Sequence, residues 1–173
     1  MYYRRKVLLA LLQSFGGSLG KTQLQKFLLL LTQRQERKAY DFVPYKYGCY
    51  SFQAAADIFT MEKYGQVAVT NKGIEKVGSD DYITLLNEKD RINLEQLFLL
   101  HGKKSYSDLI KYTYTLYPYF AIHSEIAERY LNKAELKQVF LYFEPTNLRD
   151  TPPRRRWWQF WKRKYESTTT RAA

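Results

Sequence analysis

The chain has 173 residues, of which 45% are hydrophobic and 26% charged, a composition typical of a globular protein and not of a disordered one. Its one cysteine, Cys49, excludes an internal disulfide and a cysteine-rich zinc site. The longest apolar run, residues 27–31, is far shorter than the roughly 20 residues that a membrane span needs. Together with the lack of a secretory signal, these features predict a cytoplasmic protein.

The net charge of +11 is concentrated near the end of the sequence. Residues 151–173 hold seven Lys or Arg residues and one acidic residue, which leaves a charge of +5 on residues 1–150. A solvated surface explains +5 as well as a polyanionic partner does.

Two helices separated by a glycine turn are expected at the start of the chain. Apolar residues recur at helical spacing in residues 2–14 and again in residues 21–37. The Gly-Gly pair at 16–17 supplies the left-handed conformations that end a helix. Ser18 or Thr22 is expected to cap the second helix.

Residues 38–51 read as a loop, because Pro44 and Gly48 interrupt any regular pattern. The loop is too aromatic for a solvated linker, so we expect it to pack onto the helices. Ser51 is expected to cap a third helix that Gly65 ends. A short β-hairpin follows at residues 66–77, with alternating valines on either side of an alanine and then an Asn-Lys-Gly turn.

The second half of the chain is predicted to be helical. Helical spacing appears in residues 87–102, 105–119, 123–131 and 132–143. The expected core residues of this half are Leu97, Leu100, Leu109, Ile110, Tyr114, Ile126 and Val139. Three prolines in residues 145–153 break the pattern, and the domain boundary is placed there.

The order of these elements predicts a mainly α fold. Three helices with a hairpin after the third match a winged helix-turn-helix, so the N-terminal half is expected to be winged-helix-like and the C-terminal half helical. The predicted domain is 1–148, and residues 149–173 form a basic, Trp-rich tail. A winged helix binds DNA in some proteins and another protein in others, so the fold leaves the function open.

Two segments of the chain resemble the Panacea, or SocA-like, antitoxin domain of bacteria and phages. Lys21 to Leu30 resembles that domain's "KLQKLLYF" helix, and Tyr47 to Ser51 resembles its "GP-(Y/V)-S" loop, with Cys49 where a proline is usual. Residues 2 to about 145 also resemble the N-terminal region of a bacterial family whose longer members continue into an uncharacterised α/β domain. The resemblance implies an antitoxin-like domain that neutralises a toxin by direct protein contact, or a DNA-binding module like the winged-helix relatives of that domain.

Candidate catalytic residues are sparse. His101 stands at a predicted helix end, where a cation suits the helix dipole. His123 neighbours Ser124 and Glu125, but adjacent helix positions point in different directions. The segment "GGSLGKT" lacks the glycine spacing of a phosphate-binding loop and follows a helix in place of a strand. These features favour a non-enzymatic protein without a metal or cofactor.

Nucleic-acid contacts are expected on the second helix, the third helix and the hairpin. Lysine attracts phosphate, and glutamine can bind adenine through two hydrogen bonds. The solvated face of an amphipathic helix would show the same residues. The candidates are Lys21, Gln23, Gln25, Lys26, Gln53, Lys72 and Lys76.

Partner-protein contacts are expected in the aromatic loop, because Tyr and Phe are frequent at protein interfaces, although the loop could also be buried on its own helices. Its candidates are Tyr40, Phe42, Tyr45, Tyr47 and Tyr50.

The tail adds a second set of candidates. Its cations and aromatics suit an anionic membrane surface, single-stranded nucleic acid, or no selected role. The predicted nucleic-acid contacts are Arg154, Arg155, Arg156, Lys162, Arg163 and Lys164, and the predicted partner contacts are Trp157, Trp158 and Trp161.

Two functions are therefore expected from the sequence. The first is a DNA-binding regulatory or defence-associated module, and the alternative is an antitoxin-like domain that sequesters a toxin or phage protein. The partner is nucleic acid or protein, and the sequence also allows a homodimer.

Overall fold

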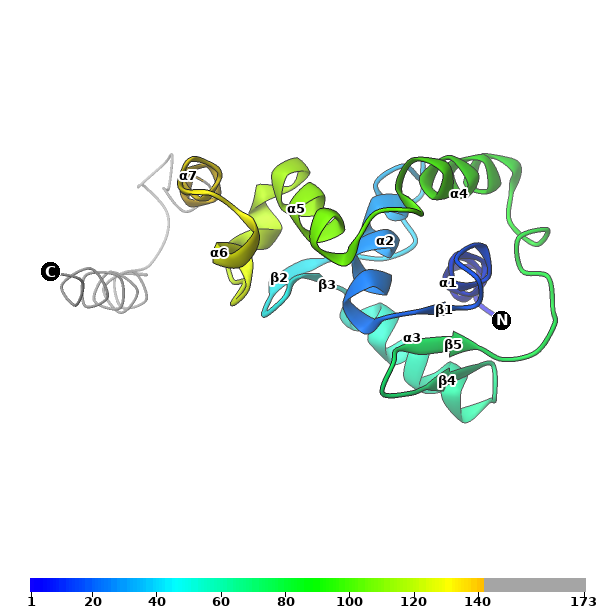
Figure 1. Ribbon diagram of the computed structural model, residues 1–173. Helices are drawn as coiled ribbons and strands as arrows, with labels where there is room; N and C mark the ends of the chain where they lie inside the picture. The colour runs from blue at the N-terminus through cyan, green and yellow to red at the C-terminus, as the bar shows by residue number, and fades with distance from the viewer. Residues whose placement is uncertain (142–173) are drawn as a thin grey trace, which may run out of the picture. The chain divides into compact units, whose positions relative to one another are not determined.

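A computed structural model describes residues 1–141 of the chain (Figure 1). The described residues belong to one compact unit, Met1–Phe143. The described residues are mainly helical with small antiparallel sheets, as predicted. No helix within residues 1–141 is long and apolar enough to cross a membrane.

The first two helices are the centre of the core. Helix α1 spans Tyr3–Ser14 and buries six consecutive residues, Val7 to Leu12, and α2 spans Lys21–Thr32 and is buried from Leu24 onward. Each large aliphatic side chain removed from water contributes about 1.5–3 kcal/mol. Apolar residues on every side of α2 explain why neighbouring elements cover it all round.

The cap of α2 differs from the prediction. The residue before the helix is Gly20, and its backbone N–H donates to Oε1 of Gln23 at 3.2 Å. Ser18 lies instead in a two-residue strand, β1 (Ser18–Leu19), which the sequence analysis did not predict.

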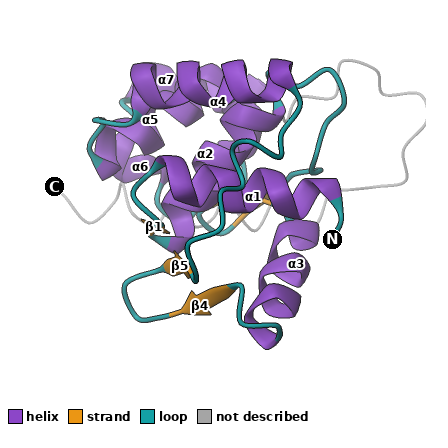
Figure 2. Cartoon of the chain, turned by 90° about the vertical axis from the view of Figure 1, so that its right-hand side faces the viewer, coloured by secondary structure: helices purple, strands orange, loops and turns teal. Residues whose placement is uncertain are grey.

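The predicted hairpin is present and belongs to a three-stranded antiparallel sheet (Figure 2). Strands β4 (Val67–Val69) and β5 (Ile74–Lys76) pair with each other, and β5 also pairs with β1 in the order β1-β5-β4. Gly73 permits this pairing, because a Cβ there would lie 2.2 Å from the carbonyl oxygen of Leu19.

Residues 43–50 form a second hairpin where a loop was predicted. Strand β2 (Val43–Tyr45) pairs with β3 (Gly48–Tyr50), so that Val43 faces Tyr50. Helix α3 (Phe52–Lys63) follows at once, and the hydroxyl of Ser51 accepts from the N–H of Ala54 at 3.2 Å. The predicted cap of the third helix is thus confirmed.

The C-terminal half contains four α-helices and one 3₁₀-helix within the described residues. They are α4 (Glu88–His101), α5 (Tyr106–Leu116), η1 (Pro118–Ala121), α6 (Ala127–Tyr130) and α7 (Lys133–Leu141). The side chain of Asn87 caps α4 by accepting from the N–H of Asp90 at 2.8 Å. The predicted helix over 123–131 is only partly present, since α6 covers four of its residues.

The core prediction for this half is wrong at one position. Leu97, Leu109, Ile110, Tyr114 and Val139 are buried, and Ile126 is partly buried. Leu100, however, is 63% exposed. Helix α4 buries Asp90, Leu94, Leu97 and His101, and Leu100 lies one residue off that stripe.

Candidate functional site

Three aromatic rings pack together where the β2–β3 hairpin meets α3. The ring of Tyr45 lies 5.1 Å from that of Tyr50 and 5.7 Å from that of Phe52, and the last two lie 5.0 Å apart. These distances are those of favourable aromatic pairs. The cluster is nevertheless open to solvent, since Phe52 is 59% exposed.

The exposed aromatic surface continues along α3. Phe52, Ala56, Phe59 and Lys63 follow one another at helical spacing, so they share a face, and Phe59 is 72% exposed. The opposite face of α3 is the buried one, with Ala54, Asp57, Ile58 and Met61. We call the exposed surface the aromatic face, made of Tyr45, Tyr47, Tyr50, Phe52, Ala56 and Phe59.

A buried lysine holds the turn of the hairpin. The ammonium of Lys26, in α2, is inaccessible to solvent and donates to the carbonyl of Tyr47 at 2.9 Å. The same ammonium lies 4.4 Å from the centre of the Tyr114 ring, a cation–π contact. Burial lowers the pKa of Lys26. A second bond, from the N–H of Glu125 to the carbonyl of Lys46 at 2.8 Å, fixes the other residue of the turn.

Gly48 lets the hairpin approach this lysine. Its φ is +99°, and a Cβ would lie 2.1 Å from Nζ of Lys26 and 2.6 Å from Cε1 of Tyr114. The hydroxyl of Tyr114 lies 2.6 Å from that of Ser124. Beside it, burial raises the pKa of the Cys49 thiol, although Lys26 acts in the opposite direction. A protonated, enclosed thiol is a packing group, since the thiolate is the reactive form.

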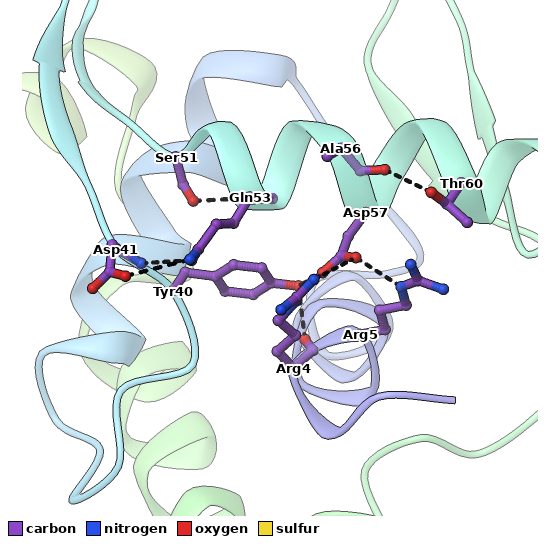
Figure 3. Close-up of polar contacts among 10 residues, drawn as sticks. Arg4, Arg5, Tyr40, Asp41, Ser51, Gln53, Ala56, Asp57 and Thr60 are labelled. Carbon is purple, nitrogen blue, oxygen red and sulfur yellow. Dashed lines mark hydrogen bonds and ion pairs between the residues drawn. The ribbon is translucent and has the colours of Figure 1, made fainter.

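An ion-pair cluster ties α3 to the start of α1 (Figure 3). The carboxylate of Asp57 accepts from Nε of Arg4 at 2.5 Å and from Nε of Arg5 at 2.7 Å. Burial alone would raise the pKa of Asp57, but the hydrogen bonds from Arg4 and Arg5 outweigh it and hold that pKa below its usual value. The hydroxyl of Tyr40 completes the cluster, 3.2 Å from the carboxylate and 2.9 Å from the carbonyl of Arg4.

Three of the predicted nucleic-acid contacts on α2 have other roles. Lys26 is buried under the hairpin, and Gln25 is buried with its side-chain oxygen accepting from the N–H of Ser51 at 2.9 Å. Gln23 is half-buried and bonds to Gly20 at the helix start. The predictions for Gln25 and Lys26 are wrong because α2 is buried in the core from Leu24 onward. Lys21 alone of the four is exposed.

The other described candidates lie at or near the surface, but the side chains of two of them, Gln53 and Lys76, already make hydrogen bonds within the protein. Gln53 is exposed and bonds to Asp41 through both its amide atoms, at 3.1 and 3.3 Å (Figure 3). Lys76 is half-buried and donates to the carbonyl of Gly78 at 2.7 Å. Lys72 is exposed in the turn between β4 and β5.

The aromatic candidates divide between core and surface. Tyr40 is 2% exposed, so its assignment to a partner surface is wrong, and Phe42 packs partly buried against the core. Tyr45 and Tyr47 are exposed, and Tyr50 is half-buried. The sequence analysis missed Phe52 and Phe59, although their spacing of seven residues on a capped helix was a readable signal. The tail candidates, Arg154–Arg156, Trp157, Trp158, Trp161 and Lys162–Lys164, lie outside the described residues.

The two histidines have different environments, one buried and one exposed. His101 is buried against Tyr112, and burial together with the nearby Arg34 lowers its pKa, so it is not the cation expected at the helix end. His123 is exposed. Within residues 1–141 no three His, Cys, Asp or Glu side chains lie close enough to hold a metal ion.

No protein-family model and no curated protein matches the chain.

Proposed function

We propose that this protein is a protein-binding module of winged-helix type, which captures a partner protein on its aromatic face. The observation that carries the proposal is the exposure of Phe52 and Phe59 on a helix whose other face is rigidly anchored. Exposed aromatic patches of this kind mark interaction surfaces, and aromatic side chains dominate binding energy at interfaces. The partner that fits is a protein that offers aliphatic or aromatic side chains and acceptors for the tyrosine hydroxyls.

The winged-helix assignment is supported by the order of the elements. Helix α1 is followed by β1, α2, α3 and the β4–β5 hairpin, and the strand order β1-β5-β4 places the first strand beside the last. The β2–β3 hairpin is an insertion between the second and third helices.

An antitoxin-like role is supported by contacts between the two segments that resemble the Panacea domain. Lys26 of the first segment donates to the carbonyl of Tyr47 in the second, and the thiol of Cys49 donates to the carbonyl of Gln25 at 3.6 Å. These contacts hold the hairpin, which carries Tyr45, Tyr47 and Tyr50 of the aromatic face, against α2. We therefore infer that the segments act together to present this surface to a protein partner.

Duplex DNA is the second candidate, and it rests on the exposed Lys21 and Lys72. Helix α3, which would enter the major groove of DNA in a winged helix, has one lysine, Lys63, and its acidic neighbour Glu62 is also exposed. Such a helix supplies little attraction for phosphate. A protein partner is for this reason the better match.

The test measures binding of a protein partner and of duplex DNA to the same preparation of the chain. The purified product of the adjacent reading frame is titrated calorimetrically into the full chain, and a random-sequence duplex is titrated in parallel over a range of salt concentrations. We expect the protein to bind, and Phe59→Ser to weaken that binding by about 2 kcal/mol, the cost of losing an aromatic hot spot. Tyr64→Ser is the control, because Tyr64 is 70% exposed at the C-terminal end of α3 but is not part of the aromatic face.

The opposite pattern would replace the proposal by the DNA-binding alternative. That pattern is duplex binding that falls steeply with salt and is lost in Lys21→Ala with Lys72→Ala, while Phe59→Ser leaves both titrations unchanged.

A further inference from the structure

His101, the last residue of α4, lies where α4 meets the end of α2 and the middle of α5. It is 5% exposed, and its Nε2 lies 3.4 Å from Nη2 of Arg34, two residues beyond α2. The ring of Tyr112, in α5, lies 4.7 Å from the imidazole ring. The ammonium of Lys104 lies 5.1 Å from the centre of the same Tyr112 ring. Two cations and one aromatic ring therefore surround the histidine.

The contact with Arg34 determines which nitrogen of the neutral imidazole carries the proton. A guanidinium can only donate hydrogen bonds, so Nε2 of His101 accepts and the ring proton sits on Nδ1. Nδ1 is buried and has no hydrogen-bond partner among the described residues. The side chain of His101 is therefore held by one hydrogen bond, which only an unprotonated Nε2 can accept.

A second proton on the ring would turn this contact into a repulsive one. Nε2 would become a donor directed at the guanidinium, and two cations would face each other across 3.4 Å. The other charge that acts on the imidazole is Lys104, also a cation. The remaining titratable neighbours are the phenols of Tyr112 and, beside Arg34, Tyr117, which supply no compensating negative charge. Burial, Arg34 and Lys104 together lower the pKa of His101.

We propose that His101 and Arg34 form a pH-sensitive latch, which closes the end of α4 on the end of α2 and opens when the imidazole is protonated. Arg34 is the fixed half of the latch. Its backbone carbonyl accepts from Nδ2 of Asn93 at 3.0 Å, and its Nη1 donates to the carbonyl of Leu30 at 3.1 Å.

The moving half is the last turn of α4 together with the turn that follows it. The N–H of Gly102 donates to the carbonyl of Phe98 at 2.7 Å, and the N–H of Lys104 donates to the carbonyl of His101 at 3.0 Å. Among residues 98–104, His101 is the one that is buried. Little apolar burial besides the imidazole thus opposes opening of this segment.

Proton linkage gives the direction and size of the effect. In the open latch the imidazole is in water with its ordinary pKa of 6.5, and in the closed latch that pKa is lower. Opening therefore takes up a proton, so its equilibrium constant rises as the pH falls below 6.5 and levels off at the pKa of the closed state. From about pH 7.5 to about pH 5.5 the rise should reach up to about tenfold.

Hydrogen exchange of the full chain, measured at both of these pH values and corrected for the intrinsic pH dependence of exchange, tests the latch. In the wild-type protein, the protection of the amides of residues 101–104 should fall by up to about tenfold at the lower pH. The β2–β3 hairpin and α1, which do not contact the imidazole, should keep their protection.

Two substitutions separate the latch from a general effect of acid. His101→Gln keeps an acceptor for Arg34 but does not titrate, so the protection of residues 101–104 should be the same at both pH values. Arg34→Gln replaces the cation by an amide that can accept from a charged imidazole. It should raise the pKa of His101, measured by proton NMR of the imidazole, and reduce the loss of protection. The chain has two histidines, so the spectrum of His101→Gln assigns the signal.

Equal protection of residues 101–104 at the two pH values in the wild-type protein would overturn the proposal, as would an equal loss in His101→Gln. An unchanged His101 pKa in Arg34→Gln would show that the guanidinium does not oppose protonation, and would overturn it too. A loss of protection that extends equally over α1 and the hairpin would mean that acid unfolds the whole chain and that no local latch exists.

Discussion

The ammonium of Lys26 donates a hydrogen bond of 2.9 Å to the carbonyl of Tyr47, across 21 positions of the sequence. A fully buried cation in α2 thus fixes the turn whose neighbours, Tyr45 and Tyr50, pack against Phe52 at the surface. The core and the aromatic face are joined at this bond. Preorganisation of this kind lowers the entropy cost of binding.

Lys26→Met should loosen the hairpin without unfolding the protein. Methionine fills a similar volume and removes the cost of burying a charge, so we expect global stability to change by no more than about 1 kcal/mol. The carbonyl of Tyr47 loses its donor, so the amide hydrogens of residues 45–50 should exchange faster. Hydrogen-exchange mass spectrometry measures this. Lys21→Met, at the exposed start of the same helix, should leave the exchange unchanged.

Gly48→Ala should be strongly destabilising. The new methyl group would lie 2.1 Å from Nζ of Lys26 on a backbone with φ +99°, so the variant combines a clash with conformational strain. We expect a loss of about 3 kcal/mol in urea unfolding. Gly65→Ala is the matched control, because Gly65 has φ +68° with nothing within 4 Å of a Cβ. It should cost only the strain, about 1 kcal/mol. Equal losses for the two variants would contradict the packing shown for Gly48.

Asp57→Asn should destabilise the protein and flatten its acid response. Replacing the carboxylate weakens its bonds to two arginines, an expected loss of about 2 kcal/mol at neutral pH. The pKa of Asp57 is lower in the folded state than its ordinary 3.8, so the unfolded chain takes up a proton first as the pH falls. The contribution is present above about pH 3.8 and is lost as the pH falls toward the folded pKa. Urea unfolding in this acid range should show a smaller slope for Asp57→Asn than for wild type.

His101→Gln should remove a separate pH dependence near neutrality. Burial lowers the pKa of His101 below 6.5, so the unfolded chain binds a proton that the folded chain rejects. The wild-type protein should therefore lose stability as the pH falls below about 6.5, until the folded pKa is reached. Thermal melts from about pH 7 to about pH 5 should show this loss in wild type and not in His101→Gln. An identical slope in the two proteins would mean that His101 does not titrate on unfolding.

The sequence predicted those features that depend on residues close together in the chain, such as helix caps and a tight turn. The Ser51 cap, the Asn87 start of α4 and the Asn-Lys-Gly turn all act within a few residues, and each is present. The strands β1 and β2–β3 were missed because they are two or three residues long. Their pairing depends on Gly73 meeting Leu19 and on Val43 facing Tyr50, which no local pattern encodes.

The largest error at the candidate site was to place Lys26 and Gln25, which are buried, at the protein surface. Lys26 and Gln25 were assigned to a solvated face because their residue types are usually exposed. Leucines or phenylalanine at positions 24 and 27–31 occupy every side of α2, however, and a helix that is apolar all round is buried with its polar residues included. That pattern was present in the sequence. The buried partners of Lys26, Tyr47 and Tyr114, were not predictable because they come from distant elements.

In-cell photo-crosslinking tests the proposed role of the aromatic face most directly. A photoreactive phenylalanine analogue replaces Phe59 in the full chain, and in a second strain it replaces Ile92 of α4; adducts are identified by mass spectrometry. We predict an adduct with one defined protein at position 59 and not at 92, which disappears when Phe52→Ser is added and reappears with the purified components. Adducts with nucleic acid at position 59, or no adduct there, would contradict the proposal that this face binds a protein.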